Sequence, residues 1–316
     1  MKVFLTHELP RVAFELLKRN KIPFDYYKDE KPIPRSILLK KVKDCTALVS
    51  LLTENVDKEL IDSMPKCKII ANYAVGYNNI DLQYAKLKNI VVTNTPDVLT
   101  DSTADLTMAL ALACARRFNE GEKMIRERKY KGWKPNLLLG TELKGKIFGI
   151  IGAGRIGNAV AIRAAGFGVK ILYSDKLKNK ELEKQLGAKK VSAETLLKKS
   201  HFISIHLPLT EITNKYLNRE RLALLKSEAI LINTSRGEII DEKELIKIIK
   251  TRKVKAVGLD VFENEPFVNK ELLKYKNVII LPHLGSATTE ARSAMAELAV
   301  KNVINVLKGK QALTPI

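Results

Sequence analysis

The feature that most narrows the possible folds is a glycine-rich turn between an apolar run and an alanine-rich segment. It reads Lys146-Ile-Phe-Gly-Ile-Ile-Gly152-Ala-Gly154-Arg155-Ile156-Gly157 and continues as Asn158-Ala-Val-Ala-Ile-Arg-Ala-Ala. The apolar run predicts a buried strand and the following segment a helix, which is the context that a G-x-G-x-x-G motif requires. The first glycine permits a tight turn, the second leaves room for a pyrophosphate, and the third lets helix and strand pack closely. We therefore predict a dinucleotide site at the helix N-terminus.

A second predicted strand, Gly168-Val-Lys-Ile-Leu-Tyr-Ser-Asp175, ends in a carboxylate at roughly the expected separation of about 20 residues. Asp175 can accept hydrogen bonds from ribose hydroxyls and would repel a 2′-phosphate, which favours NAD(H) over NADP(H). Lys176, Lys178 and Lys180 follow it, so NADP stays an alternative. A glycine turn alone would be weak support. The two strands, the helix and the terminal aspartate together indicate dinucleotide binding.

The length of 316 residues predicts two domains. No run of about 18 apolar residues is present, so we expect no membrane span. The N-terminal sequence reads as a strand rather than a signal peptide. Cys45, Cys67 and Cys114 are widely separated among apolar neighbours, which predicts buried, reduced thiols in a cytoplasmic protein rather than a zinc site or disulfide framework.

The formal net charge of +20 raises the question of a nucleic-acid partner. The lysines are scattered over predicted helices such as 38–43 and 243–250, where they alternate with apolar positions. No basic patch interleaved with aromatic residues accompanies them. We therefore expect the charge to aid solubility and attract small anionic substrates, with no nucleic-acid or membrane partner.

Short apolar runs alternate with helical patterns along the whole chain, which predicts an α/β fold with parallel sheets and helices on both faces. In the first hundred residues the predicted strands are 2–6, 24–27, 47–51, 68–72 and 90–93, and the predicted helices include 11–19, 34–42 and 82–87. A loop then leads to a predicted helix over 102–119, with Asp101 as its N-cap. Further strands are predicted near residues 149, 171, 203, 230, 257 and 279, and a last helix over 288–307.

Four histidines are candidates for proton transfer. His7 and His201 are best explained as ordinary strand-end residues, whereas His206 and His283 each end an apolar run. The carboxyl ends of parallel strands are where open α/β sheets form their ligand sites. His283 is the stronger acid–base candidate because the small residues of Leu284-Gly-Ser-Ala-Thr follow it. A lone histidine is more often structural, so this assignment depends on its companions.

Two charged residues also follow predicted strands. Arg236, in Asn-Thr-Ser-Arg-Gly, could hold a carboxylate through two parallel hydrogen bonds; the alternative is a salt bridge with Glu238 or Asp241. Glu265 follows Gly258-Leu-Asp-Val-Phe-Glu-Asn. A carboxylate beside an imidazole favours its protonated form, as a general acid requires, and the alternative is a solvated loop charge.

With these residues in view, the chain resembles the D-isomer-specific 2-hydroxyacid dehydrogenase family over nearly its whole length. The motifs are Val75-Gly-Tyr-Asn-Asn-Ile-Asp81, Asn94-Thr-Pro-Asp-Val-Leu-Thr-Asp-Ser-Thr-Ala-Asp105, the glycine motif, His206-Leu-Pro-Leu-Thr, Asn233-Thr-Ser-Arg-Gly, Leu259-Asp-Val-Phe-Glu-Asn-Glu-Pro266 and Pro282-His283. Within the family the chain looks most like glyoxylate/hydroxypyruvate reductases, from Asn94-Thr-Pro-Asp-Val-Leu-Thr-Asp and Gly132-Trp-Lys-Pro-Asn-Leu-Leu-Leu-Gly.

The resemblance implies two doubly wound parallel-sheet domains. One is a flavodoxin-like substrate domain of residues 1–98 and 284–316, and the other is a Rossmann dinucleotide-binding domain of residues 99–283. It also implies a homodimer joined through the long helix after Thr100 and the segment around Trp133. By analogy Trp133 could reach the neighbouring subunit's pocket, and a buried interface aromatic is an equal alternative.

The resemblance further implies roles for individual residues. Asp260 would face the nicotinamide carboxamide, while Thr103 and Thr234 would contact the ribose and phosphate side of the cofactor. The implied catalytic residues are Arg236, Glu265 and His283. The implied substrate residues are Leu51, Val75, Gly76, Arg236 and His283. The implied cofactor residues are Thr103, Gly152, Gly154, Arg155, Ile156, Gly157, Asp175, His206, Pro208, Thr213, Thr234, Ser235, Arg236, Asp260, His283 and Gly285.

The expected activity is reduction of a small 2-oxo acid, glyoxylate or hydroxypyruvate, to the D-2-hydroxy acid with NADH. Similar glyoxylate reductases often carry basic residues after the second strand and use NADPH, whereas this chain has Asp175. D-3-phosphoglycerate dehydrogenase is the alternative enzyme, and the segment 47–53 lacks the arginine that would meet a substrate phosphate. A non-enzymatic NADH-sensing binding protein on the same scaffold is the third possibility.

Overall fold

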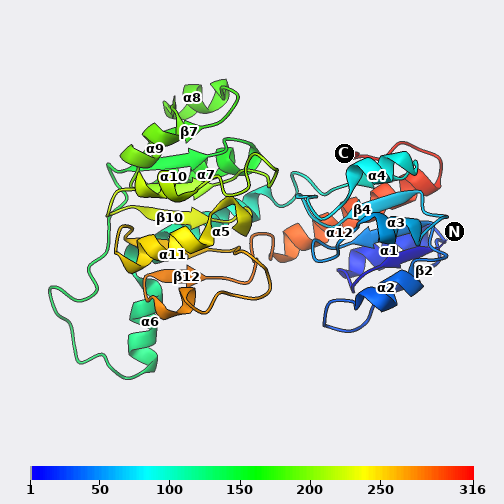
Figure 1. Cartoon of the computed structure of the whole chain (residues 1–316), viewed down its shortest axis with the longest axis horizontal. Coiled ribbons are helices and arrows are strands. Elements are labelled where there is room, and N and C mark those ends of the chain that lie inside the picture. The colour runs from blue at the N-terminus through cyan, green and yellow to red at the C-terminus, as the bar shows by residue number, and fades with distance from the viewer. Residues whose placement is uncertain (1) are drawn as a thin grey trace. The chain divides into compact units, whose positions relative to one another are not determined.

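A computed structural model describes residues 2–316, and the chain divides into two compact units (Figure 1). Unit 1 comprises the described residues up to Leu99 together with Ala287–Ile316, and unit 2 comprises Thr100–Ser286. Among the described residues, no helix combines the length and the apolar character needed to span a bilayer.

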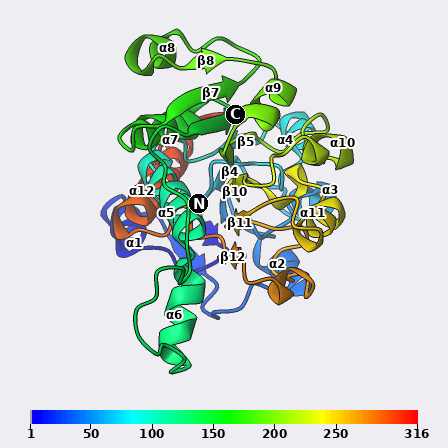
Figure 2. The ribbon, with the colours of Figure 1, turned by 90° about the vertical axis from the view of Figure 1, so that its left-hand side faces the viewer.

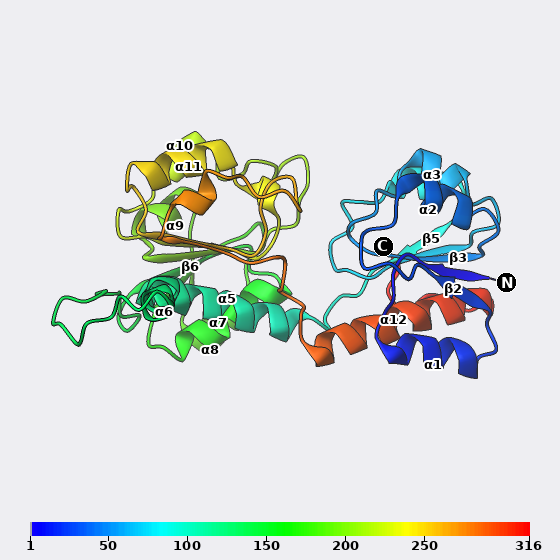
Figure 3. The same ribbon diagram turned by 90° about the horizontal axis from the view of Figure 1, so that it is seen from below.

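Unit 1 is built on a five-stranded parallel sheet with the order β2-β1-β3-β4-β5. Its strands are β1 Val3–Leu5, β2 Phe24–Tyr26, β3 Ala47–Ser50, β4 Ile69–Asn72 and β5 Val91–Thr93. Its helices are α1 Arg11–Arg19, α2 Arg35–Lys41, α3 Lys58–Asp62, α4 Leu82–Leu87 and α12 Thr289–Leu307. Figure 3 shows α1 and α12 on one face of the sheet, with α2 and α3 on the other. Every residue of the central strands β3 and β4 is buried, as expected for parallel strands covered on both faces.

Unit 2 is built on a seven-stranded parallel sheet with the order β12-β11-β10-β9-β6-β7-β8. Its strands are β6 Ile147–Ile151, β7 Lys170–Ser174, β8 Lys189–Lys190, β9 Phe202–Ile205, β10 Ile230–Asn233, β11 Ala256–Leu259 and β12 Val278–Ile280. Its α-helices are α5 Thr100–Arg116, α6 Phe118–Arg126, α7 Arg155–Ala165, α8 Lys180–Leu186, α9 Ala193–Lys199, α10 Arg219–Ala223 and α11 Glu242–Lys250. Two short 3₁₀ helices, Gly237–Ile239 and Leu272–Lys274, complete it.

The strand order of unit 2 reverses at β6, which has β7 on one side and β9 on the other. Helices α5 and α7 cover one face of this sheet, and α9, α10 and α11 cover the other (Figure 3). Ligands of open α/β sheets bind beyond the carboxyl ends of the strands at such a reversal. The predicted fold class, two parallel-sheet α/β domains, is confirmed.

The prediction for the long helix after the loop at residue 95 was wrong at both ends. α5 begins at Thr100, so Asp101 lies in its first turn, where its carboxylate accepts a hydrogen bond from Arg163 at 2.8 Å, and is not the N-cap. The helix ends at Arg116 because Arg117 adopts a left-handed conformation with φ of 55°. A separate helix, α6, starts at Phe118. Hydrophobic periodicity continued across the break and concealed it.

Helix α6 and the segment after it extend away from the sheet of unit 2 (Figure 2). We call residues 118–141 the arm. The arm returns to the end of α5, where the amide of Thr141 donates to the carbonyl of Ala115 at 2.8 Å. Several of its large apolar side chains are exposed; Trp133, for example, is 79% accessible.

Candidate functional site

The three glycines of the turn after β6 meet different physical demands. Gly152 has φ of +91°, and a Cβ there would lie 2.7 Å from the carbonyl oxygen of His206. A Cβ on Gly157 would lie 2.0 Å from the carbonyl oxygen of Gly152, so this contact between helix and strand requires glycine. A Cβ on Gly154 would meet no heavy atom within 4 Å. The first and third glycines are thus required for folding, whereas the space at the second is free for a ligand.

The surroundings of this turn suit a dinucleotide. Helix α7 begins at Arg155, so its N-terminus directs backbone N–H groups and the partial positive charge of the helix dipole toward the space beside Gly154. Asp175 follows β7, and its carboxylate accepts hydrogen bonds from the amides of Ala153 at 2.7 Å and Leu177 at 3.3 Å. The glycine-rich turn and the carboxylate of Asp175 are therefore joined by a direct hydrogen bond.

A second group of polar residues follows the neighbouring strands of the same sheet. β9, β10, β11 and β12 are paired in parallel and in register, so their carboxyl ends lie at one edge. The residues that follow these ends are His206, the segment 234–236, Asp260 and His283. Residues from four separate motifs are brought together by strand pairing alone.

His283 and Glu265 form the central contact of this edge. The imidazole Nδ1 lies 2.9 Å from a carboxylate oxygen of Glu265, and because a carboxylate only accepts, Nδ1 is the donor. The other oxygen of Glu265 accepts the amide of Phe262 at 3.2 Å. The side chains of His283 and Glu265 are 24% and 28% accessible, so the pair is partly buried and still reachable from solvent. Nε2 of the imidazole is the nitrogen left for another partner.

The backbone at His283 is unusual and firmly held. Its φ is +56°, a left-handed conformation that is strained for a residue with a Cβ. Its amide donates to the carbonyl of Asp260 at 2.9 Å. The fully buried carboxylate of Asp260 accepts the amides of Leu284 at 2.6 Å and Gly285 at 2.8 Å. Thr103 adds a hydrogen bond to the carbonyl of Gly285 at 3.2 Å.

Asp260 therefore anchors the loop that carries His283, a function that its implied role beside the carboxamide did not anticipate. Burial raises the pKa of this carboxyl group, and the two amide donors oppose that effect. The strained backbone of His283 is maintained because the amides of His283, Leu284 and Gly285 all donate hydrogen bonds to Asp260.

Arg236 lies just after the end of β10 and is partly buried. Its guanidinium donates to the carbonyl of Ser235 at 2.6 Å, and its own carbonyl accepts from Asn233 at 2.7 Å. Burial lowers the pKa of Arg236, and the negative charges of Glu265 and Glu238 counter that effect. Arginine nevertheless stays protonated at working pH. The site thus holds a fixed positive charge close to the carboxylate of Glu265.

Gly237 explains why the loops of Arg236 and Glu265 lie together. A Cβ at Gly237 would stand 2.0 Å from the carbonyl carbon of Phe262 and 2.2 Å from its oxygen. The two backbones are therefore in direct contact. Asp241, offered above as a partner for Arg236, caps helix α11 and pairs with Lys215 at 3.5 Å.

The remaining implied cofactor residues lie around the same edge. His206 contacts Ser204 at 2.8 Å through Nε2, and burial lowers its pKa to about 3, so it is neutral at working pH. The hydroxyl of Thr234 lies 2.8 Å from that of Thr107. Ser235 donates to the carbonyl of Leu207, and Thr213 donates to that of Pro208.

The implied substrate residues of unit 1 follow β3 and β4, which are adjacent strands. Leu51 comes directly after β3, and Val75 and Gly76 follow β4. The carbonyl of Val75 accepts from the side chain of Asn94 at 2.8 Å, and that of Gly76 accepts from Asn72 at 2.8 Å. These segments present backbone groups whose positions are set by asparagine side chains.

Sequence reasoning missed the residues that brace these segments. Asn79 donates to the carbonyls of Leu51 at 3.1 Å and Glu54 at 3.0 Å. The buried carboxylate of Glu54 accepts from Thr6 at 2.7 Å, from Thr53 at 2.7 Å and from the amide of Leu51. No local pattern marks such contacts, because most of the partners are far apart in sequence. Among residues 2–316, no cluster of three or more potential ligands could hold a metal ion.

A glycine-rich turn of the dinucleotide type, a partly buried arginine and a carboxylate-bound histidine at one edge of a parallel sheet are typical of an oxidoreductase that uses a nicotinamide cofactor. The NAD binding domain of the D-isomer specific 2-hydroxyacid dehydrogenases matches residues 108–285. A glyoxylate reductase from Thermococcus litoralis is 50% identical over 313 residues, covering 98% of this chain and 94% of that protein. The chain belongs to the D-isomer specific 2-hydroxyacid dehydrogenase family.

Solved structures agree with this assignment. A protein from Thermus thermophilus superimposes with a TM-score of 0.94 at 39% identity, covering 100% of both chains. A glyoxylate reductase from Paecilomyes thermophila gives a TM-score of 0.89 at 31% identity, covering 100% of this chain and 98% of that one. The resemblance predicted from the motifs is confirmed.

Proposed function

We propose that this protein reduces small 2-oxo acids, glyoxylate and hydroxypyruvate first among them, to the corresponding D-2-hydroxy acids. The observation that carries the proposal is the 2.9 Å contact between His283 and Glu265 close to the positive charge of Arg236. The similarity to glyoxylate reductases supports the choice of substrate.

Each of the three side chains has one task in this reaction. Arg236 binds the substrate carboxylate, for which a planar, permanently charged guanidinium is suited. His283 holds a proton on Nε2 and delivers it to the carbonyl oxygen as that oxygen becomes negative. Glu265 accepts the hydrogen bond from Nδ1, which keeps the imidazole oriented with Nε2 toward the substrate. When bound, NAD(P)H supplies the hydride that reduces the carbonyl carbon.

The cofactor would be held by the turn after β6. Gly154 leaves space for the pyrophosphate, the N–H groups of α7 donate to it, and Asp175 accepts from the ribose hydroxyls. We propose a preference for NADH because the carboxylate of Asp175 would repel a 2′-phosphate. Lys178, one of the nearby lysines, pairs with Glu183 at 3.1 Å. Asp175→Ser should raise kcat/KM with NADPH relative to NADH, and an unchanged ratio would refute this role.

We assign unit 2 as the dinucleotide-binding domain and unit 1 as the substrate domain. The match of residues 108–285 to a family NAD binding domain supports the first assignment. For unit 1, the support is the set of braced backbone groups at Leu51, Val75 and Gly76.

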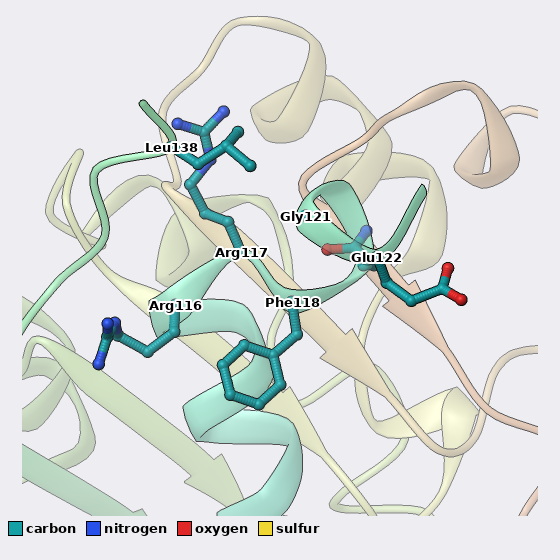
Figure 4. Close-up of a pocket in the computed structure, with 7 residues that line it drawn as sticks. Arg116, Arg117, Phe118, Gly121, Glu122 and Leu138 are labelled. Atoms are coloured by element: carbon teal, nitrogen blue, oxygen red, sulfur yellow. The ribbon is translucent and has the colours of Figure 1, made fainter. Parts of the chain in front are cut away.

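We propose that the protein forms a homodimer through α5 and the arm. Exposed apolar side chains on the arm include Phe118, Ile125, Trp133 and Leu139. A pocket of about 530 Å³ lies at the base of the arm, and its lining includes the apolar side chains of Phe118 and Leu138 (Figure 4). Burial of such surface against a second copy would remove it from water. Light scattering on the purified protein should give twice the chain mass, and Trp133→Lys should weaken the association.

The decisive experiment is a steady-state panel with NADH and with NADPH. The substrates are glyoxylate, hydroxypyruvate and phosphohydroxypyruvate. Oxidation of NADH with the first two supports the proposal. Preference for phosphohydroxypyruvate would indicate a phosphoglycerate dehydrogenase, and binding of NADH without turnover of any oxo acid would indicate a cofactor-sensing protein.

The role of Arg236 has its own test. Arg236→Ala should lower kcat/KM for glyoxylate far more than for an uncharged carbonyl compound such as an aldehyde. An equal loss on both substrates would show that the arginine does not bind the carboxylate.

A further inference from the structure

Two of the three cysteines lie together in unit 1, outside the candidate site. Cys45 precedes β3 and Cys67 precedes β4, and these two strands are adjacent. The register pairs Ala47 with Ile69, so each cysteine stands two positions before a paired residue. The pairing continues upstream, because the amide of Lys68 donates to the carbonyl of Thr46 at 2.9 Å. Cys45 and Cys67 are therefore opposite each other.

The spacing and burial of this pair suit a covalent link. Neighbouring strands lie about 4.8 Å apart, within the range of Cα separations of roughly 4.4–6.8 Å that a disulfide requires. Both thiols belong to the same hydrophobic cluster of unit 1, with 0% of Cys45 and 8% of Cys67 accessible. The thiol of Cys67 contacts the carbonyl of Ile69 at 3.2 Å. The neighbouring thiol of Cys67 and burial raise the pKa of Cys45.

We propose that Cys45 and Cys67 are a redox-sensitive pair that a small-molecule disulfide converts to a disulfide bond. Cys67, the more accessible thiol, attacks the small disulfide as its thiolate and releases one small thiol, which leaves a mixed disulfide. Cys45 then attacks the sulfur of Cys67, and its proton passes to the second small thiolate, which leaves as a thiol. Two protein thiols are oxidised and one small disulfide is reduced to two thiols.

The position of the pair determines its effect. The cysteines stand at the amino ends of β3 and β4, whereas Leu51 and Gly76 follow the carboxyl ends of the same strands. A bond at the amino ends closes a loop of roughly twenty residues and restricts the unfolded chain. We therefore expect the bond to raise thermal stability and to leave turnover unchanged within about twofold.

The test treats the folded, full-length protein with cystamine and maps its peptides without reduction. The expected product is a linked pair of peptides containing Cys45 and Cys67, lighter by two hydrogens than the separate peptides. The melting temperature should rise by about 5–10 °C and return after dithiothreitol. Absence of the linked peptides, or a linked product with no change in melting temperature, would overturn the proposal.

Variants make the assignment specific. Cys45→Ser should stop the reaction at a mixed disulfide on Cys67, and Cys67→Ser should prevent modification of Cys45. Cys114→Ser is the matched control, because this thiol is buried in the core of unit 2 and its pKa is raised to about 12 by burial. It should show the same shift in melting temperature as the wild type. If Cys45→Ser does not fold, the peptide map and its reversal in the wild type still decide the question.

Discussion

The two sheets of this protein have the same parallel construction, yet the loops at their carboxyl ends differ in chemistry. In unit 2 these loops carry charged side chains, namely Arg236, Asp260, Glu265 and His283. In unit 1 the loops after β3 and β4 present backbone groups at Leu51, Val75 and Gly76. The contrast shows that a parallel sheet supplies a place for a site, and that the residues just beyond its strands supply the function.

The same contrast holds for the buried polar groups. In unit 2, Asp260 holds the backbone of the loop that carries His283 in a strained conformation. In unit 1, Glu54 and Asn79 hold the loop after β3 without left-handed backbone at Leu51. Of these two loops, only the loop of His283, the proposed proton donor, has a strained left-handed backbone at the named residue. Four experiments test this difference between the units.

The largest effect should come from the proton donor itself. His283→Asn should lower kcat by about 10²–10⁴, because the general acid is removed while the loop contacts remain. Steady-state kinetics with glyoxylate and NADH measure it. His201→Asn is the matched control, since His201 lies at the opposite end of β9 and accepts the amide of Ile147 at 3.2 Å. Activity of His283→Asn equal to that of the control would refute the assignment.

The next largest effects are expected at the glycine turn, where one substitution should weaken cofactor binding and the other should lower stability. Gly154→Ala should weaken NADH binding by about tenfold or more with little change in melting temperature, because its Cβ faces open space. Gly157→Ala should instead destabilise unit 2 by about 1–3 kcal/mol or more, because its Cβ would strike the carbonyl of Gly152. Fluorescence titration with NADH and thermal melts distinguish the two. Equal stability losses would contradict this division.

A smaller effect concerns the pH dependence of stability that comes from His206. The unfolded chain binds a proton at this imidazole below a pKa of about 6.5, whereas the folded chain does so only near its pKa of about 3. Stability therefore falls as pH falls through this window, by about 2 kcal/mol between pH 7 and pH 5. Urea unfolding at both pH values measures the loss. Between pH 7 and pH 5, the stability of His206→Gln should fall by about 2 kcal/mol less than that of the wild type. An equal fall in both proteins would be inconsistent with a neutral imidazole at position 206.

The smallest effect is expected in unit 1. Asn79→Ala removes two hydrogen bonds that brace the loop after β3, which should cost about 1–2 kcal/mol of stability. If unit 1 binds the substrate, KM for glyoxylate should rise severalfold while kcat stays near that of the wild type. A fall in kcat with constant KM would place this loop in the chemical step instead.

Several features could be predicted from sequence because the determinants are local. The glycine motif between β6 and α7 specifies its own turn. The helical pattern of apolar residues predicted α1 at residues 11–19, as observed. Short helices such as α3 and α10, and the break at Arg117, escaped prediction. A five-residue helix carries too little periodicity, and a left-handed arginine has no sequence marker.

Local patterns in the chain were enough to show which residues stand at strand ends, and hence that Arg236, Glu265 and His283 were candidates. The folded arrangement was needed to show that Glu265 meets Nδ1 of His283, that Asp260 holds the loop of His283, and that Cys45 faces Cys67. Strand ends follow from local hydrophobic patterns, whereas contacts between loops depend on strand order and register, which no single segment encodes.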